Sequence, residues 1–180
     1  SGSSANPNNT TGTLTQNGGS LKVNDDFTVG LNGGQGTYNA NGGTVSIGSG
    51  GGSFFDIGRT TISGNPGGQG IVDLADATSV DIDVEQLRIG TMPSSANPGS
   101  TVRGELTLSN ATNTITATNI LMGDSPGAGN TGLTSQLNFG SGTTTLNVSG
   151  DITLGGRKSN ASVGADPGAI ITVSGSPNKA

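Results

Sequence analysis

Residues Gly12–Gly30 read GTLTQNGGSLKVNDDFTVG and contain three short runs in which apolar and polar side chains alternate. Alternation with a period of two places one set of side chains on one face, so each run predicts a half-buried β-strand. Gly18 and Gly19 separate the first two runs, Asn24–Asp26 separates the second from the third, and Gly30 ends the unit. This stretch therefore predicts three strands joined by tight corners.

The same unit recurs along the chain, and its first and third strands show the recurrence most clearly. The first strand gives two columns of inward positions, namely Leu14, Tyr38, Val72, Leu106, Leu137, Ile171 and then Gln16, Ala40, Leu74, Leu108, Phe139, Val173. The third strand gives Phe27, Phe55, Leu87, Ile120, Ile152 and then Val29, Ile57, Ile89, Met122, Leu154. Each third strand ends on a glycine: Gly30, Gly58, Gly90, Gly123 and Gly155. A glycine at a fixed place predicts a corner that needs positive φ or close backbone approach.

The middle strand keeps its alternation but drifts in register, and a connection rich in Gly, Pro, Asn and Ser follows each third strand. The later connections are expected at residues 63–69, 92–100, 123–132 and 158–168. The pentapeptide SSANP occurs at 3–7 and again at 94–98, so the chain is expected to begin and end inside the repeat. This predicts a partial repeat at 1–11, a repeat domain at 12–174, and a tail or the start of another coil at 175–180.

A fixed period of 20–50 residues is the signature of a solenoid, a propeller or another repeat array. Three strands per unit and no helical pattern favour an all-β, single-stranded β-solenoid (β-helix) of about five coils with three short strands each. A propeller ranks second because its blades need four strands. A β-sandwich ranks third because it does not explain matching columns.

Composition excludes several functional classes. The chain of 180 residues has 7 basic and 12 acidic residues, a net charge of −5, no His, no Cys and no Trp. Without a basic cluster or stacking aromatics, nucleic-acid binding is not expected. Without His and Cys, zinc chemistry and Ser-His-Asp catalysis are not expected, so the sequence predicts a protein that is not an enzyme. No apolar stretch approaches the ~20 residues of a membrane span.

One acidic run contains the carboxylate ligands that calcium prefers. Asp81, Asp83 and Glu85 alternate with inward apolar residues, so they are expected on the outer face of one strand. Carboxylates at such positions lie about 7 Å apart, which makes them candidate calcium ligands or a carboxylate pair acting on a sugar. The alternative is a solvated acidic stripe. Apart from calcium, no cofactor is expected. Arg59 and Arg88 fall in separate units and are not expected to converge with carboxylates on one groove.

The unit Gly-x-Leu/Tyr-x-x-x-Gly-Gly-x-Leu/Val-x-Val/Ile is best preserved in GTYNANGGTVSIGSG at Gly36–Gly50, followed by GTLTQNGGSLKVN at Gly12–Asn24. It resembles the autotransporter-associated β-strand repeats and the related repeats of PEP-CTERM-type bacterial surface proteins. The resemblance extends from Gly12 to about Val173. It implies export, a right-handed β-helix and a role in cell-surface structure or adhesion, and it supplies no catalytic residues.

These observations predict an extracellular, surface-associated structural module that acts as a stalk, an adhesin or a filament subunit. Its expected partner is itself, because an uncapped solenoid exposes strands to which another chain can pair. Residues Ala169–Val173 are expected to be a first strand that completes the coil begun by Thr10–Gln16 of the next copy. The residues expected at this contact are Leu14, Gln16, Ile171 and Val173. The alternative is a β-helix that binds or degrades surface polysaccharide.

Overall fold

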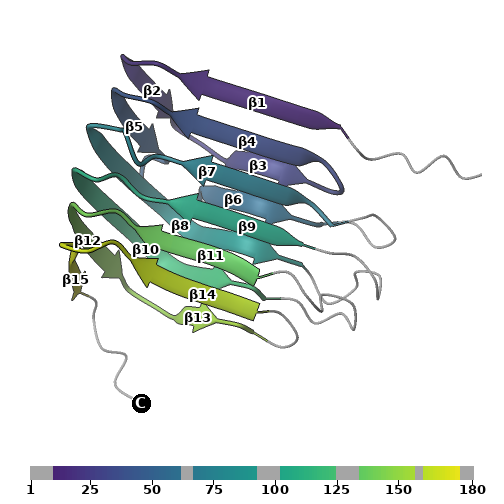
Figure 1. Ribbon diagram of the computed structural model, residues 1–180. Helices are drawn as coiled ribbons and strands as arrows, with labels where there is room; N and C mark the ends of the chain where they lie inside the picture. Colours follow the sequence, from purple (N-terminus) through teal and green to yellow (C-terminus); the bar gives the residue numbers. More distant parts are fainter. Residues whose placement is uncertain (1–9, 62–66, 93–101, 125–133, 157–159, 175–180) are drawn as a thin grey trace, which may run out of the picture.

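The computed structural model describes residues 10–61, 67–92, 102–124, 134–156 and 160–174, and these residues form strands, turns and no helix. The first strands of successive units form a six-stranded sheet, which consists of β1 (Thr11–Gln16), β4 (Gln35–Ala40), β7 (Gln69–Asp73), β9 (Arg103–Thr107), β11 (Thr134–Phe139) and β14 (Asn160–Ala165). The other strands form a second sheet, which consists of β2 (Ser20–Val23), β3 (Phe27–Leu31), β5 (Thr44–Ile47), β6 (Phe54–Arg59), β8 (Ser79–Thr91), β10 (Thr112–Met122), β12 (Thr143–Val148), β13 (Ile152–Leu154) and β15 (Ile170–Ser174). Figure 1 shows the coils stacked from β1 at one end to β14 and β15 at the other.

Every ladder is parallel, and each strand pairs with the equivalent strand of the next unit. Leu14 pairs with Tyr38 and Tyr38 with Val72, as the first-strand column predicts. Phe27 pairs with Phe55 and Phe55 with Leu87, as the third-strand column predicts. In two units the middle and third strands join into one long strand, β8 or β10. The predicted all-β solenoid is therefore confirmed.

The number of coils is slightly lower than predicted. The inner columns are buried in about four turns, from β4 to β12, where residues such as Tyr38, Leu74, Ile89 and Leu106 are at most 1% exposed. The coil of β1 to β3 leaves Leu14 exposed, and the strands β13 to β15 leave most of their apolar side chains exposed. The first and last units each have a neighbour on one side only, so most of their inward side chains stay at least partly exposed. These end units therefore do not count as complete, buried turns.

The glycines that end the third strands have the predicted role. Gly58 has a φ of 64°, a region that disfavours residues with a side chain. A Cβ atom on Gly58 would lie 1.8 Å from the carbonyl oxygen of Arg103 at the start of β9. Gly70 of β7 faces this corner from the other sheet, because its Cβ would lie 2.5 Å from the nitrogen of Gly58. Backbones of the two sheets thus touch directly along one edge of the solenoid.

The last unit differs from its prediction. Ile171 and Val173 were expected in a first strand, but β15 pairs with the middle strand β12, so that Ile171 lies beside Thr144 and Val173 beside Leu146. The first strand of this unit is β14, which falls within the connection expected at 158–168 and places Val163 beside Leu137. β14 has one large apolar side chain, so alternation alone gives it a weak signal, and pairing with β11 decides its structure. The other predicted connections, the partial repeat expected at 1–11 and the segment expected at 175–180 lie largely or wholly outside the described residues.

Candidate functional site

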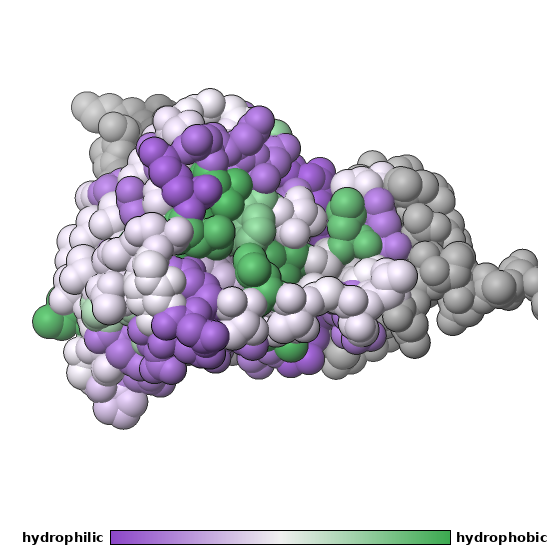
Figure 2. Space-filling view, turned by 90° about the horizontal axis from the view of Figure 1, so that it is seen from above, coloured by the Kyte–Doolittle hydropathy of each residue, from purple (hydrophilic) through white to green (hydrophobic). Residues whose placement is uncertain are grey.

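The end of the solenoid formed by β1 to β3 exposes side chains that are core residues in every inner coil. Leu14 is 45% exposed, whereas its column partners Tyr38 and Val72 are at most 1% exposed. β1, β3 and β4 line a hollow of about 530 Å³ at this end. Figure 2 looks down on this end and shows hydrophobic residues at its centre within a rim of hydrophilic ones. This end therefore presents an apolar surface and the unpaired backbone edge of β1.

One polar side chain covers part of this open end. Gln16 occupies an inward position, and its Oε1 accepts a hydrogen bond of 2.6 Å from the hydroxyl of Tyr38. Its Nε2 donates to the carbonyl oxygens of Gly19 and Thr44, at 3.3 and 3.2 Å. Burial raises the pKa of the Tyr38 hydroxyl to about 12. Gln16, which interrupts the apolar column in the sequence, thus satisfies the one buried phenol of the core.

The opposite end is more apolar. Ile152, Leu154, Val163 and Val173 are between 43% and 61% exposed, although each is aligned with a core column. These side chains line a pocket of about 270 Å³, together with Ile171 of β15 and buried core residues of β10, β11 and β12. Within the described residues, no strand pairs with the outer edges of β13, β14 and β15.

The four residues predicted for self-association therefore lie at the two ends of the stack. Leu14 and Gln16 are on β1, and Ile171 and Val173 are on β15. Within one chain the structure does not bring the two pairs together, since four further strands of each ladder lie between these ends. Any contact between them has to join separate chains.

The predicted acidic stripe lies on β8, and its side chains alternate with buried residues as expected. Asp83 and Glu85 line a lateral groove of about 530 Å³, together with Thr116, Thr118 and Asn147 from neighbouring coils. Asp81 is exposed and does not line this groove. Among the residues that the structure describes, no three acidic side chains are grouped so that they could hold a metal ion. The calcium site at Asp81, Asp83 and Glu85 thus stays a prediction without geometric support.

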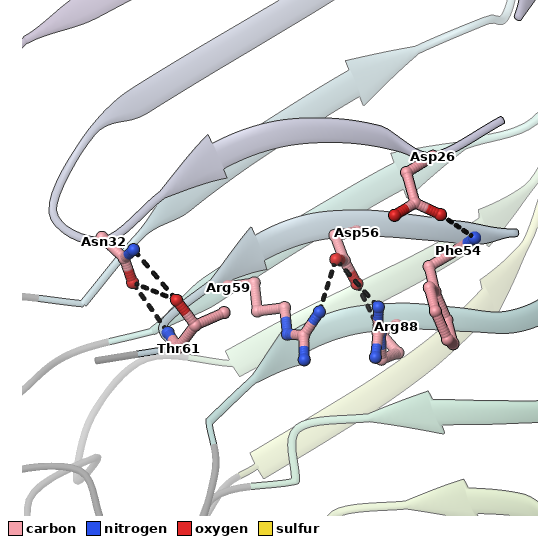
Figure 3. Close-up of polar contacts among 7 residues, drawn as sticks. All are labelled: Asp26, Asn32, Phe54, Asp56, Arg59, Thr61 and Arg88. Atoms are coloured by element: carbon pink, nitrogen blue, oxygen red, sulfur yellow. Dashed lines mark hydrogen bonds and ion pairs between the residues drawn. The ribbon is translucent and has the colours of Figure 1, made fainter. Parts of the chain in front are cut away.

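A buried ionic cluster joins two neighbouring coils, as Figure 3 shows. Asp56 of β6 accepts hydrogen bonds from Arg88 of β8, at 2.5 Å from Nε and 3.0 Å from Nη2. Arg59 Nη1 donates to the same carboxylate at 2.8 Å. The guanidinium of Arg88 also lies 4.0 Å from the centre of the Phe54 ring, a cation–π contact. Burial lowers the pKa of Arg88 from its ordinary value, while the hydrogen bonds to Asp56 act in the opposite direction.

Sequence reasoning missed this cluster and expected the two arginines to remain apart. Asp56 is 5% exposed and Arg88 is 9% exposed, although both occupy positions that alternation places outside the core. Stacked coils are only about 4.8 Å apart, so residues of successive units are neighbours when their register agrees. In each third strand, one residue lies between the two inward positions. Aligning these residues from successive units pairs Asp56 with Arg88, and the ladder between β6 and β8 has this pairing. The single Asp56 carboxylate is shared by two guanidinium groups, and all three side chains are held by these contacts, so the cluster is a fixed structural contact between coils.

None of the described residues belongs to a helix that is long and apolar enough to cross a membrane. Comparisons with protein-family models, with curated proteins and with solved structures find no match for this chain.

Proposed function

We propose that this chain is a structural β-solenoid module that associates end to end with copies of itself, as part of an extracellular, surface-associated filament or stalk. One observation carries the proposal: apolar side chains that belong to core columns are exposed at both ends of the stack. Leu14 marks one end, and Val163 and Val173 mark the other. Stacking the two ends would bury these side chains and pair the edges of the two main ladders, by the same contacts that join coils within the chain.

Contact between unlike ends repeats without closing, so each added copy exposes a new end of the same kind. Such a heterologous contact builds open filaments. The resemblance to repeats of bacterial surface proteins supports an extracellular setting, and the absence of Cys from all 180 residues is compatible with it. No catalytic role is part of this proposal.

Sedimentation velocity over a range of concentrations tests this function, with one end variant and one matched lateral variant. Leu14→Lys places a charge where an apolar contact is proposed, so it should abolish or strongly weaken concentration-dependent association. Ile71→Lys is the control, because Ile71 is 40% exposed, compared with 45% for Leu14, but lies in β7 within the stack. Association that is unaffected by Leu14→Lys, or equally reduced by both variants, would refute end-to-end stacking.

The alternative function is polysaccharide binding along the lateral groove. The observation that favours it is a row of hydroxyl, amide and carboxylate groups that crosses several coils, including Thr116, Asn147 and Glu85. Such groups can hydrogen-bond to sugars, although none of the described residues that line the groove is aromatic. Depletion of acidic and neutral glycans from solution, with and without calcium, measures this activity. Retention that is lost in Glu85→Gln would support the alternative.

A further inference from the structure

We infer that the junction between two copies continues the register of the solenoid, with β14 of one copy paired with β1 of the next and β15 paired with β2. This inference rests on the proposed end-to-end association and specifies its geometry. It assigns the exposed apolar ends to one occupant, a second copy of the same chain. Matching strand lengths, matching inward columns and one polar corner support this register.

The first-strand sheet supports the pairing of β14 with β1. Both strands are six residues long, and they are the two edge strands of the same parallel sheet. Within the chain, Val163 lies beside Leu137 and Leu14 lies beside Tyr38, so both residues belong to the same inward column. Continuing this register into the next copy places Val163 beside Leu14. It also places Ala165 beside Gln16. The small Ala165 side chain leaves room for the Gln16 amide, which Tyr38 already holds.

The second sheet gives a consistent match. β15 and β2 carry the same two inward columns, because Ile171 and Val173 continue the positions of Leu21 and Val23 through β12, β10, β8 and β5. In-register stacking would therefore place Ile171 beside Leu21 and Val173 beside Val23. Val173 is 61% exposed in the single chain, so this contact removes one of its most exposed apolar side chains from water.

The corner between the two sheets does not prevent this match. Four residues separate β14 from β15, whereas three separate β1 from β2. The same difference already exists between the last unit and the one before it, because three residues separate β11 from β12. Those two units nevertheless stack with both strands in register. The extra residue is thus absorbed at the corner.

A polar contact at this corner would add specificity. Asn17 follows β1 directly, and its Oδ1 accepts a hydrogen bond of 3.0 Å from Nδ2 of Asn41 in the next coil. Because Asn17 uses its oxygen on this side, its amide nitrogen is suited to donate to a residue stacked on the other side. Asp166 follows β14 directly and therefore occupies the matching corner. In the junction, the Asp166 carboxylate would accept this hydrogen bond from Asn17 of the next copy.

Disulfide trapping tests the register in the full chain, which contains no native cysteine. Thr13 and Ser162 are exposed positions that face each other in the proposed junction, since they flank Leu14 and Val163. Neighbouring parallel strands place their Cα atoms about 4.8 Å apart, within the range of a disulfide. The double variant Thr13→Cys/Ser162→Cys should therefore form a ladder of disulfide-linked oligomers under mild oxidation, whereas each single variant should stop at dimers.

The matched control is Thr15→Cys/Ser162→Cys, which displaces one cysteine by two residues. Its Cα atoms would be about 8 Å apart, beyond the reach of a disulfide. A ladder for the first pair and none for the control supports the inference. Equal ladders from both pairs, or none from either while sedimentation still shows association, would overturn the register and leave the proposed function standing. Absence of association in the parent chain as well would overturn both.

Discussion

At the scale of single residues, Tyr38 links the core to the open end of the solenoid. Its ring is 1% exposed, and its hydroxyl donates to Gln16 on the outermost coil. The ring of Phe27 meets it edge-on, at 5.8 Å between centroids. A phenolate in this place would lose its hydration, which is why burial raises the pKa of the hydroxyl.

This pKa predicts how stability depends on alkaline pH. Because the pKa in the folded state is about 12, and that in the unfolded chain is about 10, the stabilisation is complete below pH ~10 and is lost as pH rises toward 12. The loss should be on the order of 2–3 kcal/mol, and Tyr38→Phe should remove this pH dependence. Tyr38 is the only tyrosine, so its ultraviolet absorbance reports the titration directly. A midpoint near 10 would contradict this account.

The carboxylate of Asp56 is predicted to be the most sensitive charged group among those described here. Asp56→Ala removes the partner of Arg88, leaves a guanidinium at 9% exposure without that carboxylate, and should cost about 3–5 kcal/mol in unfolding free energy. Glu105 provides a matched control, because it pairs with Arg103 in a more exposed setting. Glu105→Ala should cost only about 0–1 kcal/mol. Urea denaturation of both variants measures the difference, and equal costs would show that burial does not govern the Asp56 contact.

At the scale of elements, the corner glycines keep the two sheets in register with each other. Gly58 needs its left-handed φ, and its Cα faces the backbone of Arg103 in the opposite sheet. Gly58→Ala should therefore destabilise the fold by roughly 2–5 kcal/mol, through conformational strain and a backbone clash. Gly51→Ala is the control, because Gly51 also has positive φ, 56°, but its Cβ would meet nothing within 4 Å.

The control should lose only about 1–2 kcal/mol, the cost of the left-handed conformation alone. Thermal unfolding of the two variants separates conformational strain from packing. Similar losses in both would mean that the close approach of the two sheets at Gly58 contributes little.

Some strands could be predicted from the sequence alone and others could not. Paired columns such as Phe27 with Phe55 were predictable because large apolar residues recur with the strand alternation. β14 was not predictable, because Val163 is its only large apolar residue and the alternation is therefore weak. The Gly and Asn residues around it instead favoured a connecting loop. The Asp56–Arg88 contact was missed for a related reason. Alternation assigns each residue to one face of its strand, but only the register between strands determines which residues of successive coils are neighbours.

At the scale of the whole molecule, the inner coils share the same buried columns, whereas the two ends of the solenoid differ from each other. Gln16 partly covers the first end, whereas the described residues at the last end leave Val163 and Val173 exposed. The open ends were predictable in outline from the columns. The strand that forms the last edge was not, because Ile171 and Val173 fit the alternation of either a first or a middle strand and only pairing with β12 distinguishes them.

Filament mass per length tests the central claim, end-to-end stacking, most directly. Each copy adds six rungs to the first-strand sheet, so at about 4.8 Å per rung it should lengthen a filament by about 29 Å. With a chain mass of 17.5 kDa, scanning transmission electron microscopy should give roughly 0.6 kDa per Å in the thinnest filaments. Discrete particles of single-chain mass at every concentration, or filaments whose thinnest form has twice this mass per length or more, would contradict end-to-end stacking.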